Sequence, residues 1–148
     1  MSLIETFLAQ AEKRPDALAI VDGDGRRVSF GQLAQRAAAR ARVLRGMGIG
    51  AGDRVLVARG VSIELYEVLL AIFQVGAVAT FPEPSGGLDG VRHAVRMTQP
   101  KAFAGALLAR VLRPFVPELR GLDRIPDPDG GGAVAAALLF YAVTNFGV

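Results

Sequence analysis

The sequence predicts an α/β fold, in which a doubly wound, mainly parallel sheet carries helices on both faces and an antiparallel hairpin lies near the N-terminus. First, helix-like segments alternate with short apolar runs along the chain. Second, these runs show no alternation of polar and apolar residues, which is typical of parallel strands buried on both faces. Third, 51% of the 148 residues are hydrophobic and no long polar tract interrupts them. The composition therefore indicates a folded domain with a proper core rather than a disordered chain.

The chain is expected to begin with a helix and a hairpin. Ser2–Arg14 predicts a helix with Leu3, Phe7 and Ala11 on one stripe, ended by Pro15. Ala17–Asp22 and Arg27–Phe30 are the two strands of the hairpin, joined by a Gly-Asp-Gly turn.

The second helix is predicted to run from Ser29 to about Arg45. Ser29 and Gln32 are three residues apart, which is the spacing of a capping box at a helix N-terminus. Gln35 and Arg42 lie opposite the inner face, and the arginines of this helix are interpreted as a solvated surface. The predicted inner face consists of Leu33, Ala37, Ala41 and Leu44.

A run of alternating glycines then separates this helix from the next strand, Val55–Ala58. These glycines follow a helix, whereas a phosphate-binding loop follows a strand and opens a helix. The spacing also differs from G-x-G-x-x-G, because Ala51 occupies the third glycine position. The run is therefore interpreted as a structural turn. It consists of Gly46, Gly48, Gly50 and Gly52.

A largely buried helix is predicted from about Ser62 to Gly76. Glu64, Glu67 and Gln74 fall close together on it and are interpreted as a narrow solvent-facing stripe, although Glu64 and Glu67 could also be a functional carboxylate pair. These polar residues argue against a membrane span at 61–81. The uncharged segment 133–148 has only 16 residues, fewer than the ~20 that a span needs.

The rest of the chain continues the alternation. Ala77–Phe81 and Lys101–Ala104 are predicted strands, with a helix at Leu88–Met97 between them. A helix at 106–112 follows, then an exposed loop at 123–132, a strand at 135–143 and a divergent tail over 133–148. No internal repeat is visible, so residues 1–148 are expected to form a single subdomain.

Composition and charge narrow the class of protein. The net charge is only +3 and the arginines are scattered, whereas nucleic-acid binding needs a clustered basic face with aromatic residues. We therefore expect no nucleic-acid partner. There is no cysteine, and the N-terminus carries Glu5 in its apolar stretch and lacks a cleavage site, unlike a signal peptide. These features favour a cytoplasmic location.

Few residues are candidates for catalysis. His93 is the single histidine and is expected to be exposed on its helix. Asp22 and Asp24 flank turn glycines and are expected to form the turn. Asp127 and Asp129 lie in a Pro- and Gly-rich segment that is typical of a flexible connection. Neither a P-loop nor a G-x-S-x-G motif occurs. No residue is assigned a catalytic, cofactor-binding or metal-binding role.

Five pieces of the sequence, taken in order, resemble the start of the acyl-adenylate-forming enzymes, which are the AMP-dependent synthetases and ligases. The resemblance covers residues 7–84 well and 85–104 loosely. The pieces are Pro15–Asp22 (the family's first strand), Ser29–Leu33 (its T-Y-x-E-L helix entry), Gly48–Val55 (its G-I-x-x-G-D-R-V turn), Gly76–Val78 (its G-A-V strand) and the exit prolines Pro82 and Pro84.

The resemblance implies part of an enzyme that uses ATP and magnesium to convert a carboxylic acid into an acyl-adenylate. Such enzymes usually pass the acyl group on to coenzyme A or another thiol, as acyl-CoA ligases do. The family's phosphate loop, rich in Ser, Thr and Gly and ending in lysine, would follow a strand like 135–143. Here residues 142–148 read A-V-T-N-F-G-V instead. The family's functional residues therefore have no matching positions, and the chain alone is expected to bind no cofactor.

Three accounts of the chain follow from that departure. It is expected to be a truncated synthetase, from a frameshift or early stop near Leu139, that is inactive alone. It could instead be half of a split enzyme whose second polypeptide supplies the missing remainder. It could also be a non-catalytic interaction module that kept the fold and lost the chemistry.

Overall fold

The computed structural model describes residues 1–105 and 112–126, which form parts of two compact units. The first unit comprises residues 1–52 and 61–77, and the second comprises 53–60 and the residues from 78 onward. The predictions of a helix at 106–112 (apart from its last residue), a strand at 135–143 and a divergent tail at 133–148 lie outside the described residues. So do Asp127, Asp129 and residues 127–132 of the predicted loop at 123–132.

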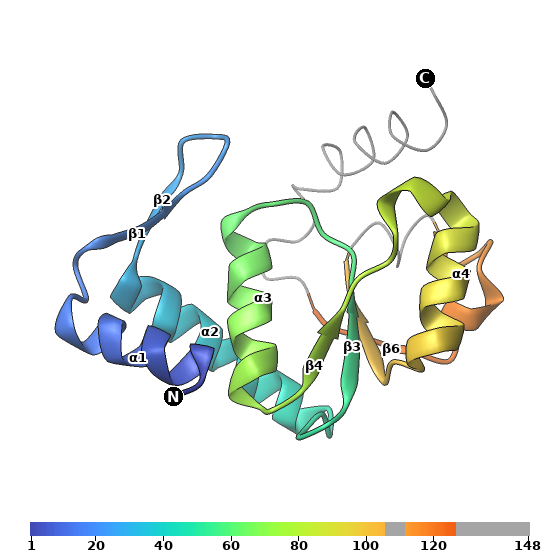
Figure 1. The fold of residues 1–148 in the computed structure, drawn as a ribbon, viewed down its shortest axis with the longest axis horizontal. Helices are drawn as coiled ribbons and strands as arrows, with labels where there is room; N and C mark the ends of the chain where they lie inside the picture. The colour runs from blue at the N-terminus through green and yellow to red at the C-terminus, as the bar shows by residue number, and fades with distance from the viewer. Residues whose placement is uncertain (106–111, 127–148) are drawn as a thin grey trace. The chain divides into compact units, whose positions relative to one another are not determined.

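The first unit contains three helices and the hairpin (Figure 1). Its elements are α1 (Leu3–Lys13), β1 (Leu18–Val21), β2 (Arg27–Ser29), α2 (Phe30–Gly46) and α3 (Ile63–Gln74). β1 and β2 pair antiparallel, with a register shift between Leu18 and Ile20. The predicted hairpin is thus confirmed.

The predicted capping box at the start of α2 is confirmed in both directions. The Ser29 hydroxyl accepts from the Gln32 backbone N–H at 3.2 Å, and the Gln32 side-chain oxygen accepts from the Ser29 N–H at 3.1 Å. These two bonds satisfy N–H groups that an α-helix leaves without an internal partner. Ser62 caps α3 in a similar way, accepting from the Leu65 N–H at 3.2 Å.

Apolar residues from the helices and the hairpin form the core of the first unit. All four residues predicted for the inner face of α2 are buried, and Gln35 and Arg42 are exposed as predicted. The α1 stripe is only partly as expected: Ala11 is buried and Phe7 joins the core, but Leu3, in the first turn, is 68% exposed. The core comprises Val28, Leu33, Ala37, Ile63 and Leu70, with Ile4, Phe7, Ala19 and Ile20 packed against it.

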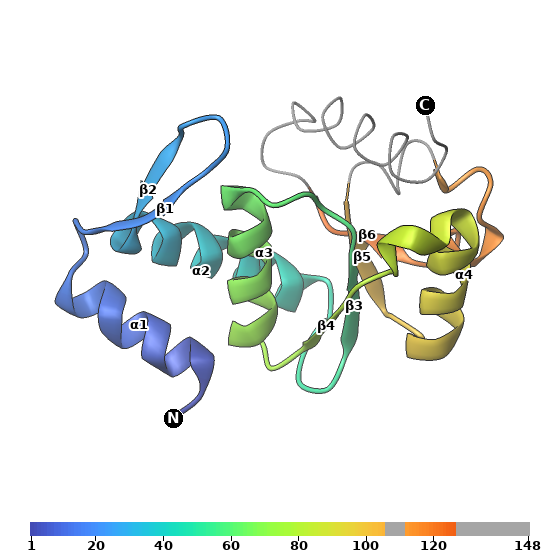
Figure 2. The same ribbon diagram turned by 45° about the horizontal axis from the view of Figure 1, so that its top comes forward.

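The second unit is built on a parallel sheet in the order β4-β3-β5-β6 (Figure 2). β3 spans Arg54–Val57, β4 spans Val78–Thr80 and β5 spans Ala102–Ala104. β3 pairs with β4 on one side and with β5 on the other. The chain thus adds strands on both sides of β3, which is the doubly wound connectivity that the sequence predicts.

A short strand at Asp123–Arg124, β6, corrects one prediction. We expected an exposed loop at 123–132, but these two residues pair parallel with β5, and the Ile125 N–H donates to the Phe103 carbonyl at 2.9 Å. Ile125 is buried. Two residues are too few to give a periodic pattern, so only the partner strand defines this one.

Helix α4 (Gly87–Thr98) packs on the sheet of the second unit (Figure 1). A short 3₁₀ turn at Pro84–Gly86 directly precedes α4, and another at Pro117–Leu119 lies between β5 and β6 in sequence. The core between helix and sheet comprises Leu56, Val91, Ala94, Val95, Phe103, Leu112, Val116 and Leu119. The α/β class, with its mainly parallel sheet and antiparallel hairpin, is confirmed.

Candidate functional site

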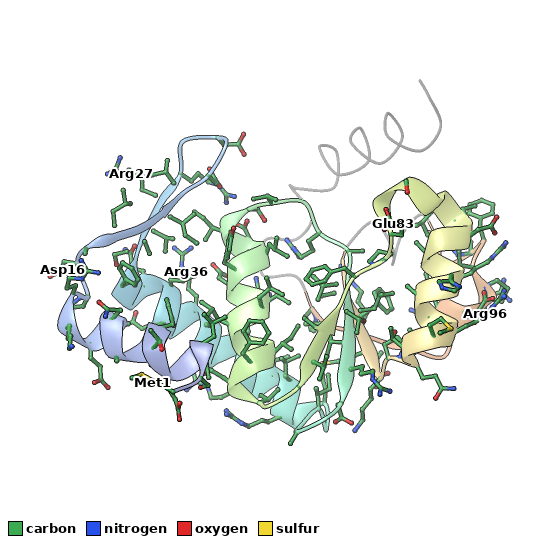
Figure 3. All side chains as sticks on the ribbon, viewed as in Figure 1. Met1, Asp16, Arg27, Arg36, Glu83 and Arg96 are labelled. Atoms are coloured by element: carbon green, nitrogen blue, oxygen red, sulfur yellow. The ribbon has the colours of Figure 1, made fainter. Side chains whose placement is uncertain are left out.

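The carboxyl ends of β3 and β5 are where this fold would place a ligand. After β3 the chain adds β4 on one side, and after β5 it adds β6 on the other. In doubly wound sheets, ligands bind outside the carboxyl ends of strands at such a reversal. Arg59 follows β3 and is partly buried, and Glu83, labelled in Figure 3, follows the neighbouring strand β4 and is exposed.

The backbones that leave β3 and β5 lie against each other at this reversal. The Ala58 N–H donates to the Ala104 carbonyl at 2.9 Å. Gly105 follows with φ of +150°, and a Cβ there would lie 2.5 Å from the Ala58 carbonyl oxygen. Glycine is therefore needed for the two chains to approach this closely. Backbone atoms of the two segments therefore fill the space at the carboxyl ends of β3 and β5. The next residue after Ala58, Arg59, is the cationic residue nearest to this point in the sequence.

Glu64 and Glu67, on α3, do not form the solvent-facing stripe that we predicted, because each is only 4% exposed. Glu64 accepts two hydrogen bonds from the Arg26 guanidinium, at 2.6 and 3.0 Å. Glu67 accepts from Arg40 Nε at 2.9 Å and from Arg36 Nη1 at 3.3 Å. Both carboxylates are therefore members of ion pairs inside the first unit, which is a structural role.

The arginines of α2 are also placed differently from the prediction. Arg36, labelled in Figure 3, has a side chain that is 52% exposed. Arg40, one turn further on, has a side chain only 10% exposed, and its Nη2 is buried with no hydrogen-bond partner among the described residues. The solvated face predicted for these arginines is thus wrong for Arg40.

The electrostatics of Arg26 follow from its two carboxylate partners. The hydrogen bonds with Glu64, and then those with Asp22, raise the pKa of the Arg26 guanidinium above its usual range. Arg26 therefore stays charged at neutral pH, as arginine side chains do. Since its side chain is 49% exposed, water screens part of this attraction.

The sequence contained a signal for these pairs that we did not use. A charged residue is seldom buried unless it is paired, so two carboxylates on an otherwise apolar helix imply cationic partners. Arg36 and Arg40 are spaced i, i+4 and lie on the same side of α2. The sequence does not indicate which arginine pairs with Glu64 and which pairs with Glu67.

Asp22 and His93 take the structural roles that we predicted for them, whereas Asp127 and Asp129 lie outside the described residues. The Asp22 carboxylate accepts from the Asp24 and Arg26 backbone N–H groups, each at 3.0 Å, and so closes the hairpin turn. His93 is exposed on α4. In residues 1–105 and 112–126, no three His, Cys, Asp or Glu side chains gather closely enough to hold a metal ion.

The alternating glycines form a helix-to-strand turn, as predicted. The Gly48 N–H donates to the Arg45 carbonyl and the Ile49 N–H to the Leu44 carbonyl, the two bonds of a Schellman motif. Gly48 and Gly52 have φ of +77° and +79°. Gly46 is the last residue of α2. Because the turn ends a helix instead of opening one, its amides do not form an anion site.

Comparison with known proteins identifies the family. A model of the family "AMP-binding enzyme" matches residues 7–128. The chain is 34% identical over 115 residues to the olefin beta-lactone synthetase of Stenotrophomonas maltophilia, which covers 70% of this chain and 21% of that protein. It is 43% identical over 76 residues to the phenyloxazoline synthase MbtB of Mycolicibacterium paratuberculosis, which covers 51% of this chain and 6% of that protein.

Solved structures show the same fold. A putative long-chain-fatty-acid CoA ligase from Rhodopseudomonas palustris superimposes with a TM-score of 0.77 at 23% identity, over 90% of this chain and 34% of that one. The chain belongs to the AMP-binding enzyme family, as the resemblance over residues 7–84 predicted.

Two further facts bear on the size and setting of the protein. The chain spans about a fifth or less of the length of the curated relatives that it matches. Within the part of the chain that the structure describes, every helix is too short or too polar to cross a bilayer.

Proposed function

We propose that residues 1–148 belong to a single N-terminal subdomain of an enzyme that activates a carboxylic acid. In the proposed reaction, ATP with magnesium converts the acid into an acyl-adenylate, and the acyl group then passes to coenzyme A or another thiol. The observation that carries this proposal is the family match over residues 7–128, on a chain whose parallel sheet has the family's fold. Since the reaction consumes ATP, we also propose a cytoplasmic location.

We further propose that this chain alone does not catalyse the reaction. In the proposed first step the carboxylate of the acid attacks the α-phosphorus of ATP and pyrophosphate leaves. Negative charge develops in the transition state, and fixed backbone amides, a cationic side chain and a metal ion must stabilise it. The sequence holds two lysines, and neither follows a Ser/Thr/Gly-rich loop. Lys13 lies in the last turn of α1, and Lys101 pairs with Asp53 at 3.2 Å. The buried carboxylates are likewise occupied by arginines, which supports a scaffold role for the described residues.

The test is acid-dependent exchange of pyrophosphate into ATP, with a panel of aromatic, short-chain and long-chain carboxylic acids. We expect no exchange above background for the purified 148-residue chain, while a full-length acyl-CoA ligase serves as the positive control. Exchange by the chain alone with any acid of the panel would refute the proposal that it is inactive by itself.

A second measurement separates the three accounts of the chain. The genomic DNA beyond codon 148 should encode, in one of the three frames, a Ser/Thr/Gly-rich loop that ends in lysine. If a separate open reading frame encodes that loop, mixing the two purified polypeptides should restore exchange, which would establish a split enzyme. If no frame and no partner supplies the loop, the enzyme proposal fails and the chain is an interaction module.

A further inference from the structure

The distal half of the β1–β2 hairpin has little apolar attachment to the rest of the first unit. Val28, near the base of the hairpin, is its single fully buried residue. Val21 and residues 23–27 are exposed, and Asp22 alone among residues 21–27 is partly covered. A two-stranded hairpin is marginally stable in water unless other contacts hold it. Something other than apolar burial must therefore hold residues 21–27 in place.

Arg26 supplies that attachment through charge-assisted hydrogen bonds. Its Nη1 donates to Glu64 Oε1 at 2.6 Å and its Nη2 to Glu64 Oε2 at 3.0 Å, across 38 residues of sequence. Its Nε donates to Asp22 Oδ2 at 2.8 Å. Paired, parallel bonds between a guanidinium and a carboxylate are among the strongest hydrogen bonds in proteins. One side chain thus joins the turn of the hairpin to the first turn of α3.

The Asp22 carboxylate, which accepts a hydrogen bond from Arg26, also stabilises the turn of the hairpin. Asp22 Oδ1 accepts from the Asp24 and Arg26 backbone N–H groups, and the Asp22 N–H donates to the Arg26 carbonyl at 3.0 Å. The Asp22 side chain is 4% exposed, whereas that of Arg26 is 49% exposed. Release of the guanidinium into water therefore loosens the turn and the link to α3 together.

We propose that Arg26 is a latch, and that the hairpin segment 21–27 opens and closes as a local unit while α2 and α3 stay folded. Proteins open locally where few apolar groups are buried, and the free energy of opening is set by the contacts that break. In this segment the hydrogen bonds of Asp22 and the pairing of Val21 with Arg27 lie within the hairpin, whereas the hydrogen bonds of Arg26 with Glu64 join it to α3. The strength of the Arg26–Glu64 pair therefore sets the fraction of molecules in which the hairpin is open.

Residue-resolved hydrogen exchange on the full 148-residue chain tests the latch. In Arg26→Gln, the amides of Asp22, Asp24 and residue 26 should exchange roughly tenfold or more faster, because the charge-assisted hydrogen bonds that hold the closed hairpin are lost. Arg26→Lys keeps the charge but not the paired geometry, so it should give a smaller increase at the same amides. In both variants the amides of residues 37–44 in α2 should exchange at the wild-type rate.

Arg36→Gln is the matched control, because the Arg36 side chain is similarly exposed (52% against 49% for Arg26) and also pairs with a buried carboxylate of α3. It should leave the hairpin amides unchanged. The proposal is overturned if Arg26→Gln leaves exchange in the hairpin unchanged, or if it speeds exchange in α2 and the hairpin alike. Failure of both Arg26 variants to fold would overturn it equally, since a latch on a locally opening segment is not needed for the rest to fold.

Discussion

Replacing Glu67 with glutamine removes the negative charge from a carboxylate that two arginines of α2 share. Glu67 is 4% exposed, and Arg40, its closer partner at 2.9 Å, has a side chain only 10% exposed. Arg36, at 3.3 Å, is 52% exposed and can turn to water. The substitution therefore leaves one cation, that of Arg40, both buried and uncompensated.

The expected loss of stability follows from this difference in burial. Breaking a buried ion pair by removing one partner typically costs about 3–5 kcal/mol. Glutamine keeps an oxygen that can still accept from Arg40 Nε, so we expect a loss of about 2–3 kcal/mol for Glu67→Gln. Arg36→Gln breaks a pair whose cation is half in water and should cost less than about 1 kcal/mol.

Urea unfolding followed by circular dichroism measures both changes, provided that the slope of the transition is the same in the variants. A third variant, Arg40→Met with Glu67→Leu, removes both charges and the buried Nη2 that has no described hydrogen-bond partner. It should be more stable than Glu67→Gln, since apolar residues often replace a buried pair at little cost. The reasoning is refuted if Glu67→Gln costs no more than Arg36→Gln, or if the double variant is the least stable of the three.

Two further predictions concern glycines, and both can be checked by thermal unfolding. Gly48→Ala should destabilise the protein by about 1–2 kcal/mol, because alanine is strained at φ of +77°. Gly46 lies at the end of α2, and a Cβ there would meet no other atom within 4 Å. Gly46→Ala should therefore be neutral or stabilise the protein by up to about 1 kcal/mol. Equal effects of these two alanines would contradict the assignment of the turn. Gly105→Ala should cost about 2 kcal/mol or more, because its Cβ would lie 2.5 Å from the Ala58 carbonyl oxygen. A Gly105→Ala protein as stable as the wild type would mean that the segments following β3 and β5 do not approach each other this closely at Ala58 and Gly105.

Local signals along the chain predicted most of the individual elements. Ser29 and Gln32 are only three residues apart, so the capping box depends on nothing outside that turn. The Schellman bonds at Gly48 likewise join residues that are close in sequence. Gly76, with φ of +75°, follows α3 as the sequence indicated. In each of these places the backbone requirement, an unsatisfied N–H or carbonyl group or a positive φ, and the residue that satisfies it lie within a few positions of each other.

Electrostatic pairing and the shortest strand could not be predicted in that way. Glu64 and Glu67 have the spacing of a solvated stripe, and only the packing of α2 and the hairpin around α3 turns them into buried ion pairs. Arg40 is buried for the same reason. β6 exists because β5 offers its backbone groups to Asp123–Arg124, not because those two residues favour a strand.

The sequence by itself thus determined the family and the order of helices and strands. Helix caps, glycine turns and apolar runs depend only on residues that are close together in the chain, so they can be recognised without the tertiary structure. Tertiary structure alone decided which charges are buried, which partners they have, and which backbone groups complete the sheet. These outcomes depend on residues tens of positions apart, 38 for Arg26 and Glu64, that are brought together only when apolar surfaces pack.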